Sequence, residues 1–415
     1  MTQALDPAAA AAAPSASAPD PAGRAERLIS RLAERASAYD ADASFPAADM
    51  EDIRAEGLLG LLVPTELGGL GAGFEDYTRV AMALARGSGA TALLFNMHAS
   101  VTGALAGIPE EMAAAIGVPA EFFATRDRLL GAAAEGALYG VAITERGAGS
   151  RLWATETTYA REGEGFRLKG HKSVCSGAGH LDAYLVTARA AEVEEGAEPR
   201  VSYFLVPGGA GMEVEHSWDP LGMRATASNG FSLDARVSAD TLVGGVEGLV
   251  RLLAYAMPQW LVASYASVYV GVAQAALTEA VRHLEGRVVE GERGGLGRLA
   301  SVRARLGRAD AQVEGARLVL EEAGRRVDRA PGDPETNRWI YRAKLLAGDA
   351  AMDVAASLSE ASGLGALRRG AALERIFRDA RSGAIMPPSS DVCADYLGAA
   401  ALGLDPATGS DVRPW

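Results

Sequence analysis

Two short runs of small and hydroxyl-bearing residues have the composition of a ligand-binding edge. The first, from Thr144 to Ser150, reads TERGAGS and follows an alternating, strand-like segment; the second, Val174-Cys175-Ser176, ends another β-rich segment. Small residues in a turn between strands let a ligand approach backbone N–H groups closely, and the hydroxyls of Thr144, Ser150 and Ser176 add hydrogen-bond donors. Taken alone, these residues also suit an ordinary hairpin turn, so the elements around them must decide.

The overall charge argues against several classes of partner. The chain has 415 residues and a formal charge of −13, with no basic cluster to offset it. Such a chain is not expected to bind nucleic acid or an anionic membrane. Its two cysteines, Cys175 and Cys393, and its five histidines have no CxxC or HxxxH spacing, which predicts neither a disulfide framework nor a structural metal site. We therefore expect a metal-free protein of the reducing cytoplasm.

Two further segments bear on membranes and targeting. Residues 252–278 carry no Asp, Glu, Lys or Arg and are long enough to cross a bilayer. However, Pro258, Gln259 and Ser264 interrupt the run, and no excess of Lys or Arg flanks one side, so a helix buried in a bundle is favoured. Residues 1–23 are rich in Ala, Pro and Ser without a basic segment, which predicts a disordered tail rather than a signal peptide.

The remaining chain divides into three parts by its hydrophobic periodicity. Residues 24–138 have helical spacing and predict an N-terminal helical domain, whereas residues 139–244 have a period of two and predict a small β-barrel or sandwich. Residues 245–403 return to helical spacing and predict an antiparallel four-helix bundle, followed by a tail at 404–415. This order gives an α+β fold class. The expected strands are Tyr139–Ile143, Glu156–Ala160, Gly165–Leu168, Ala183–Ala188, Val201–Val206, Met212–Glu215 and Gly230–Val237.

Proline, glycine and aspartate residues indicate where the C-terminal helices begin and end. In Pro331-Gly332-Asp333-Pro334, Asp333 is expected to cap a helix whose first residue is Pro334. The helices expected in this part are Gly248–Glu285, Arg298–Ala330, Pro334–Gly363, Ala372–Ala380 and Asp391–Ala401.

With four short motifs in order, the chain from about Arg24 to Leu402 resembles the acyl-CoA dehydrogenase family of flavoproteins. The motifs are ITERGAGS at 143–150, LGMRAT at 221–226, GVAQ at 271–274 and RDAR at 378–381. The resemblance implies an acyl-CoA dehydrogenase-like fold with an FAD whose ring lies between the β domain and the helix bundle. It also implies a homo-oligomer, either a dimer or a tetramer, and an acyl thioester substrate on CoA or an acyl carrier protein, with an electron-transfer flavoprotein as partner.

The same resemblance implies which residues hold the flavin. Backbone around Ile143, Thr144 and Ser150, and around Val174, Cys175 and Ser176, would hold the ring and tune its electronics. The family usually has Trp-Ile-Thr or Trp-Ile-Ser at the second run, so this chain keeps the hydroxyl but lacks the aromatic residue. Arg287 falls where the family pairs an arginine with the FAD pyrophosphate of a neighbouring subunit, although a solvated cation at a helix end is an equal alternative. Ser389 is also expected near the FAD.

A catalytic base is missing from both places where the family carries its glutamate. Pro387 stands at the position in the loop after RDAR, and Leu261 stands at the position on the first bundle helix. Neither side chain can remove a proton. The candidates for a relocated base are Asp391, which more simply caps the final helix, and His98, which more simply packs in a helical core. Glu145 in the turn motif is interpreted as structural.

Two reactions therefore remain open. The first is the α,β-desaturation of an acyl thioester with a relocated base, in secondary metabolism rather than β-oxidation. The second is a flavin-dependent monooxygenase that hydroxylates a nitrogen or a carbon, with diffusible FMNH2 or FADH2 from a separate flavin reductase and no need for an α-proton base. A flavin-binding homologue without turnover is a third alternative. Family membership places the dehydrogenase first.

Overall fold

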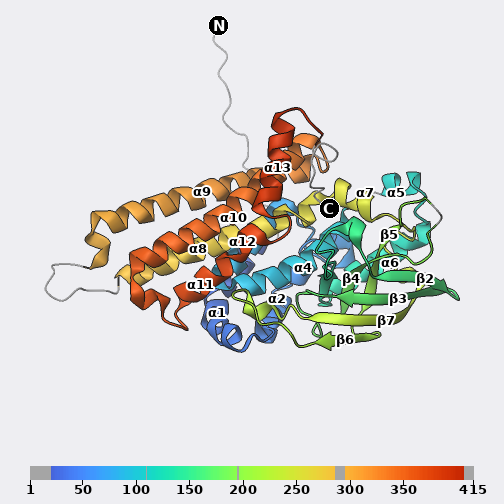
Figure 1. The fold of residues 1–415 in the computed structure, drawn as a ribbon, viewed down its shortest axis with the longest axis horizontal. Coiled ribbons are helices and arrows are strands. Elements are labelled where there is room, and N and C mark those ends of the chain that lie inside the picture. Colours follow the sequence, from blue (N-terminus) through green and yellow to red (C-terminus); the bar gives the residue numbers. More distant parts are fainter. Residues whose placement is uncertain (1–19, 109, 194–195, 286–294, 406–415) are drawn as a thin grey trace, which may run out of the picture.

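The computed structural model describes residues 20–108, 110–193, 196–285 and 295–405, in which helices and a β-sheet lie side by side (Figure 1). The first helices are α1 (Pro21–Asp42), α2 (Ala47–Ala55), α3 (Phe74–Gly87), α4 (Gly89–Ala106), α5 (Glu110–Ala115) and α6 (Ala120–Ala134). The strands are β1 (Tyr139–Ala142), β2 (Thr158–Glu162), β3 (Gly165–Lys172), β4 (Ala183–Ala190), β5 (Val201–Pro207), β6 (Met212–Glu215) and β7 (Gly230–Ser238). The last helices are α7 (Val250–Ala256), α8 (Ala263–Glu285), α9 (Ala300–Arg329), α10 (Pro334–Ser362), α11 (Ala372–Ala380), α12 (Ser382–Ile385) and α13 (Ser390–Ala401).

The seven strands form one sheet, in which β4 has neighbours on both edges. β5 pairs with β4 in antiparallel register, whereas β1 and β2 both pair with β4 in parallel register, one after the other along its length. The order then continues through β3 and β7 to β6. Each strand was expected from its period of two, and the small β domain is confirmed.

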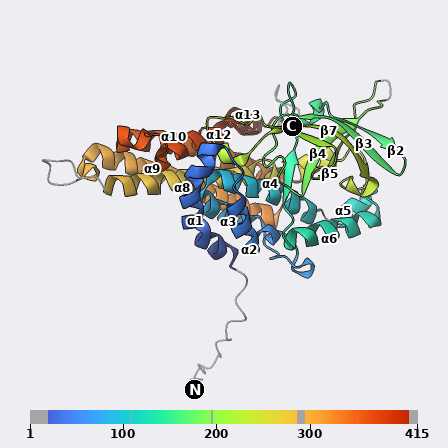
Figure 2. The same ribbon diagram turned by 90° about the horizontal axis from the view of Figure 1, so that it is seen from below.

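Three long helices, α8, α9 and α10, lie together on the side of the molecule away from the sheet (Figures 1 and 2). Shorter α11 packs against both α8 and α10, and α3 packs against α8 and α9. The carboxylate of Asp333 accepts hydrogen bonds from the backbone N–H groups of Glu335 (2.9 Å) and Thr336 (3.2 Å), so the expected cap of α10 is confirmed. The order of the elements also confirms the acyl-CoA dehydrogenase-like arrangement of an N-terminal helical part, a middle β part and a C-terminal helical part.

One expected helix is divided. Gly248–Glu285 was expected to be continuous, but α7 ends at Ala256, a single 3-10 turn covers Pro258–Trp260, and α8 begins at Ala263. Proline at 258 has no backbone N–H and its ring disfavours the preceding helical turn, which explains the break. The segment from Pro258 to Glu285 is long and apolar enough to cross a membrane, and 72% of its most apolar window is buried within the fold. It is the core helix that the sequence indicated.

Helix α4 joins the two halves of the core. Nearly all of its residues are buried, and it contacts β1 on one side and α8 on the other (Figure 1). A helix that is apolar around its whole circumference is stable only when it is surrounded by protein. Its first turn is capped by the Ser88 hydroxyl, which accepts a hydrogen bond from the Thr91 N–H at 3.3 Å. The space between sheet and bundle is therefore bounded by α4, β1 and the beginning of α8.

Candidate functional site

A cavity of about 330 Å³, which we call the central cavity, lies between the sheet and the helices. Three groups of residues form its walls. The sheet side contributes Val141, Ile143, Thr144, Ser150, Leu152, Val174 and Ser176. Helices α4 and α8 with the turn before α8 contribute Leu93, Met97, Tyr265 and Leu261. The segment before β7 contributes Trp218, Pro220, Leu221, Gly222, Met223, Thr226 and Ser228, and the chain from α11 to the loop after α12 contributes Arg378, Arg381, Ser382, Ile385, Met386 and Pro387. Five of the eight residues expected to hold a flavin therefore lie together in one cavity.

The TERGAGS run lies in a segment that leaves the sheet after β1 and returns to it at β2; we call this segment the detour. β1 leaves the edge of β4 after Ala142, which pairs with Val186, and β2 returns to the same edge at Thr158, which pairs with Arg189. Between them the chain turns back at Glu145 and Gly149, whose backbone groups exchange two hydrogen bonds of 2.9 Å. Gly149 has φ +62°, a backbone conformation that other residues rarely adopt. The detour brings Thr144 and Ser150 to the wall of the central cavity.

A buried ion pair supports this detour from behind. Lys172 Nζ donates to the Thr187 carbonyl (2.7 Å), which the break between β1 and β2 leaves without a strand partner, and lies 2.6 Å from Glu145 Oε1. Glu145 also accepts from Thr157, both from its backbone N–H (3.1 Å) and from its hydroxyl (2.6 Å). Burial alone would raise the pKa of Glu145, but the Lys172 ammonium and these hydrogen bonds outweigh it and lower the pKa. Glu145 thus has a structural position, and neither member of the pair lines the cavity.

The second run, at 174–176, is held beside the first. The Ser173 N–H donates to the Thr144 carbonyl at 2.9 Å, which sets Val174 and Ser176 against the cavity. Cys175 points the other way: its thiol is buried, donates to the Val141 carbonyl (3.4 Å), and burial raises its pKa to about 12. Because the Cys175 N–H is already bonded to the Asn229 carbonyl (3.0 Å), neither group of this residue is directed to the cavity.

Both positions expected to lack a base lie in the cavity wall. Pro387, from the loop after α12, and Leu261, just before α8, are lining residues of the same cavity. No aspartate, glutamate or histidine is present among the described residues that line it; its ionisable side chains are Arg378, Arg381 and the phenol of Tyr265. The two positions at which the resemblance implies a glutamate therefore lie in one cavity, and both are occupied by apolar residues.

The relocated bases suggested by the sequence lie outside this wall. His98 is fully buried on α4, where Nε2 bonds the Leu59 carbonyl (2.8 Å) and Nδ1 accepts from the Tyr139 N–H (3.1 Å). Burial lowers the pKa of His98 to about 4, so the ring is neutral, and both of its nitrogens are engaged in hydrogen bonds to the backbone. Asp391 is exposed in the first turn of α13. It was expected to cap that helix, but the cap is Ser389, whose hydroxyl accepts from the Val392 N–H. Arg287 lies outside the described residues.

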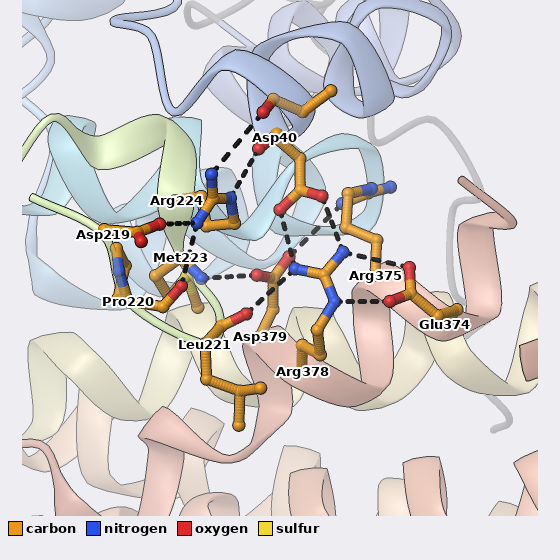
Figure 3. A network of polar contacts seen from close by, with 11 residues as sticks. Asp40, Asp219, Pro220, Leu221, Met223, Arg224, Glu374, Arg375, Arg378 and Asp379 are labelled. Carbon is orange, nitrogen blue, oxygen red and sulfur yellow. Dashed lines mark hydrogen bonds and ion pairs between the residues drawn. The ribbon is translucent and has the colours of Figure 1, made fainter. Parts of the chain in front are cut away.

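The RDAR and LGMRAT motifs meet in a network that joins three parts of the fold (Figure 3). Arg378 forms a two-pronged ion pair with Asp40 at the end of α1, at 2.6 and 3.0 Å, and a second one with Glu374. Asp379 accepts from the Met223 N–H at 2.6 Å. An added Cβ at Gly222 would lie 2.2 Å from the Arg378 carbonyl oxygen, which explains the glycine. The network positions one wall of the central cavity.

A second, smaller cavity of about 50 Å³ adjoins the first, and we call it the apolar cavity. It shares Val141, Ile143 and Leu261 with the central cavity. The rest of its wall is formed mainly by aliphatic and aromatic side chains, among them Val101, Leu105, Ile108, Leu185, Val243, Leu253, Met257 and Trp260. Ser100 also lines it, and its hydroxyl already bonds the carbonyls of Asn96 (2.8 Å) and Trp260 (3.0 Å). This cavity offers space for an apolar group and no charged partner among its lining residues.

The residues present fit a flavin ring. A flat, mostly apolar ring system with polar edges needs apolar walls with a few hydroxyl and backbone groups at fixed places. The central cavity has these in Thr144, Ser150 and Ser176, and its aromatic residues are Tyr265 on α8 and Trp218, which comes from the segment before β7 rather than from the second run. Sequence reasoning missed Trp218, Tyr265 and Lys172. For Tyr265, its spacing of one helical turn from Leu261 was an available signal.

Comparisons with known proteins agree with this geometry. Sequence models of the N-terminal, middle and C-terminal domains of acyl-CoA dehydrogenases match residues 25–112, 140–235 and 262–402. The L-evernosamine nitrososynthase of Micromonospora sp. is 32% identical over 390 residues, which cover 91% of this chain and 89% of that protein. The cyclohex-1-ene-1-carbonyl-CoA dehydrogenase of Geobacter metallireducens is 27% identical over 380 residues, 89% of this chain and 94% of that protein.

Among solved structures, FMN-bound TdsC from Paenibacillus sp. A11-2 superposes with a TM-score of 0.80 at 25% identity, over 92% of this chain and 97% of that one. The proteins that this chain resembles thus include a dehydrogenase, a nitrososynthase and, in TdsC, a dibenzothiophene monooxygenase. The matches extend over all three parts of the fold and include each of the motifs that line or support the central cavity. The chain belongs to the acyl-CoA dehydrogenase family of flavin-dependent oxidoreductases.

Proposed function

We propose that this protein is a flavin-dependent monooxygenase that hydroxylates a nitrogen or a carbon of a small organic substrate. The observation that carries the proposal is the central cavity itself, in which Pro387 and Leu261 occupy the two positions for a base and no described lining residue is a carboxylate or a histidine. α,β-Desaturation requires a base that removes the α-proton as hydride leaves. Oxygen transfer from a reduced flavin does not.

A reduced flavin held in the central cavity would supply the two electrons that reduce one atom of O2 to water while the other atom enters the substrate. The chain's own contribution is to position and to exclude water. Thr144, Ser150 and Ser176 offer hydroxyl groups to the polar edges of the ring from the sheet side, and Trp218 offers an aromatic face. Leu261, Met97 and Leu93 close the helical side with apolar groups, which protects the oxygen-activating step from solvent.

The relatives support this assignment by their names. The nitrososynthase from Micromonospora sp. at 32% identity is named for the formation of a nitroso group, and TdsC, a dibenzothiophene monooxygenase, has been solved with FMN. FMN or FAD delivered in reduced form by a separate NADH-dependent reductase is therefore the cofactor that we propose, in place of an FAD that a substrate reduces. An amine in its uncharged form is the first substrate class to test.

The test is reductase-coupled oxygenation. The purified protein, FMN, NADH and a flavin reductase are incubated under ¹⁸O2 with a panel of amines, amino sugars and aromatic heterocycles, and products are analysed by mass spectrometry. We expect one ¹⁸O atom in the product of at least one substrate class, with NADH and O2 consumed in equal amounts. If every consumed O2 appears as hydrogen peroxide across the whole panel, the proposal fails.

A further inference from the structure

Tyr265 occupies a distinctive place in the helical wall of the central cavity. It lies in the first turn of α8, four residues after Leu261, which precedes the helix, and both residues line the cavity. Leu261 is also part of the apolar cavity, whereas Tyr265 lines the central cavity only. The Tyr265 phenol is therefore a polar group of the central cavity that comes four residues after Leu261, a residue shared by both cavities.

The hydroxyl of Tyr265 forms no hydrogen bond with any described residue, although its side chain is partly buried. Among the other polar groups of the wall, Ser228 and Trp218 have partners, whereas the hydroxyls of Thr144 and Ser150 on the sheet side have none among the described residues. Ser228 bonds Ser176 (3.0 Å) and Thr226 (2.7 Å), and the indole N–H of Trp218 donates to the Arg224 carbonyl (3.1 Å). A hydroxyl that lines a cavity and has no partner in the protein is available to donate a hydrogen bond to a ligand there.

The phenol remains a donor at every physiological pH. Burial raises the pKa of Tyr265 to about 12, so the O–H is intact and cannot act as a base. What it can do is donate one hydrogen bond to an acceptor oxygen or nitrogen. Because no carboxylate lies among the described lining residues, the cavity offers no counter-charge to an ammonium group, which favours a ligand that enters uncharged.

We propose that the Tyr265 hydroxyl donates a hydrogen bond to an acceptor atom of an uncharged substrate, whose apolar part enters the adjoining apolar cavity past Leu261. This proposal rests on the monooxygenase function only for the reaction that the bound substrate undergoes. The binding contact itself does not depend on that function. Leu261, at the place of the missing base, then separates the polar contact from the apolar one and limits the width of what can reach across.

The experiment compares two ligands of nearly the same shape, acetophenone and α-methylstyrene, which differ in having a carbonyl oxygen or a methylene group. Binding to the FMN-loaded protein is measured by isothermal titration calorimetry for the wild type, Tyr265→Phe and Tyr269→Phe. Tyr269 is the matched control, because it lies one turn further along α8, is fully buried, and its hydroxyl has no partner and does not line the cavity. A single hydrogen bond predicts that the wild type prefers the ketone about threefold to tenfold.

We expect Tyr265→Phe to lose this preference and Tyr269→Phe to keep it. The inference is overturned if the wild type shows no preference, if Tyr265→Phe retains it, or if both variants lose it. Fluorescence of bound FMN, measured in a Trp218→Phe background because the indole would otherwise quench the ring, is a second measurement that needs no substrate analogue. A tyrosine in the same cavity quenches the ring by electron transfer, so Tyr265→Phe should brighten it and Tyr269→Phe should not. Equal brightness in all three proteins also contradicts the placement. If Tyr265→Phe loses the ketone preference but the wild type oxygenates no substrate, this inference stands and the monooxygenase function is refuted.

Discussion

Lys172 Nζ lies 2.6 Å from Glu145 Oε1, and both side chains are buried behind the turn that carries Thr144 and Ser150. The pair closes the break in the sheet where β1 departs from β4 and β2 returns. Its ammonium satisfies the Thr187 carbonyl, and its carboxylate anchors Thr157 at the beginning of the returning chain. The binding turn can therefore leave the sheet without leaving buried backbone groups unpaired.

Removal of one partner of this pair should be strongly destabilising. Lys172→Met and Glu145→Gln are each expected to lower the free energy of unfolding by about 3–5 kcal/mol, because each leaves a buried charge or polar group uncompensated. The double variant should lose less than the sum. Glu145 has a lowered pKa, so its contribution is present above its ordinary pKa of 4.5 and is lost as the pH falls below that value. Urea unfolding at several pH values measures both effects.

The exposed pair of Arg236 and Glu162 (2.9 Å) is the control for this prediction. Arg236→Gln should change stability by less than about 1 kcal/mol, as exposed ion pairs generally do. Strictly additive losses in the Lys172/Glu145 double variant would contradict the direct coupling.

His98 should act on stability and not on turnover. Its pKa is lowered by burial from 6.5 to about 4 in the folded protein, so the unfolded chain binds a proton first as the pH falls. The wild type should lose about 3 kcal/mol from this group between pH 6.5 and 4. His98→Ala should be less stable at pH 7, since it leaves the Leu59 carbonyl and the Tyr139 N–H without partners, and the difference from wild type should shrink as the pH falls. A His98→Ala protein of normal stability with abolished turnover would restore His98 as a base.

Ser389 and Asp391 should contribute to helix α13 only. Ser389→Ala removes the N-cap and should lower stability by about 1 kcal/mol, and Asp391→Asn removes a favourable charge from the first turn, worth about 0.3–1 kcal/mol. Neither residue lines the central cavity. Thermal unfolding and FMN titration of the two variants measure stability and affinity separately. A tenfold weaker flavin affinity in Ser389→Ala would instead place Ser389 at the cofactor, as the resemblance implied.

Arg378 should not tolerate exchange for lysine. A guanidinium can serve Asp40 and Glu374 with two prongs each, whereas an ammonium is a single point of charge (Figure 3). Arg378→Lys should therefore lower the free energy of unfolding by about 1–3 kcal/mol. The matched control is Arg381→Lys, because Arg381 is exposed and forms no ion pair with a described residue; its effect should stay within about 0.5 kcal/mol. Equal effects of the two exchanges would mean that the forked geometry is unimportant.

The repeating patterns of the sequence predicted the elements well because those patterns are themselves the cause of burial. Strand β6 lies at Met212–Glu215, as expected, and helix α11 at Ala372–Ala380. The predictions that were wrong concern where individual helices begin and end. Ser389 and Asp391, two positions apart, both have side chains suited to capping, and the structure places the serine at the cap. The charge-free run at 252–278 was correctly assigned to a buried helix, but the strength of Pro258 as a breaker was underestimated.

The site was predictable only in part, because partners distant in the chain decide it. The two small-residue runs could be recognised from their own composition, and five of the residues expected to hold a flavin line one cavity. Nothing local to Glu145 indicates that Lys172 will neutralise it, or that Cys175 will turn its thiol toward Val141. The empty base positions were visible in the sequence, but only the fold shows that Pro387 and Leu261 face the same space.

The absence of a base among the described lining residues of the central cavity is most directly tested by anaerobic titration of the flavin-loaded protein with saturated acyl-CoA thioesters of short, medium and branched chains. The visible absorbance of the oxidised flavin is recorded, with dithionite as the positive control for reduction. We predict that no thioester bleaches the flavin, because no lining carboxylate or histidine can remove the α-proton. Bleaching by any one of them would contradict the monooxygenase assignment and return the protein to the dehydrogenases.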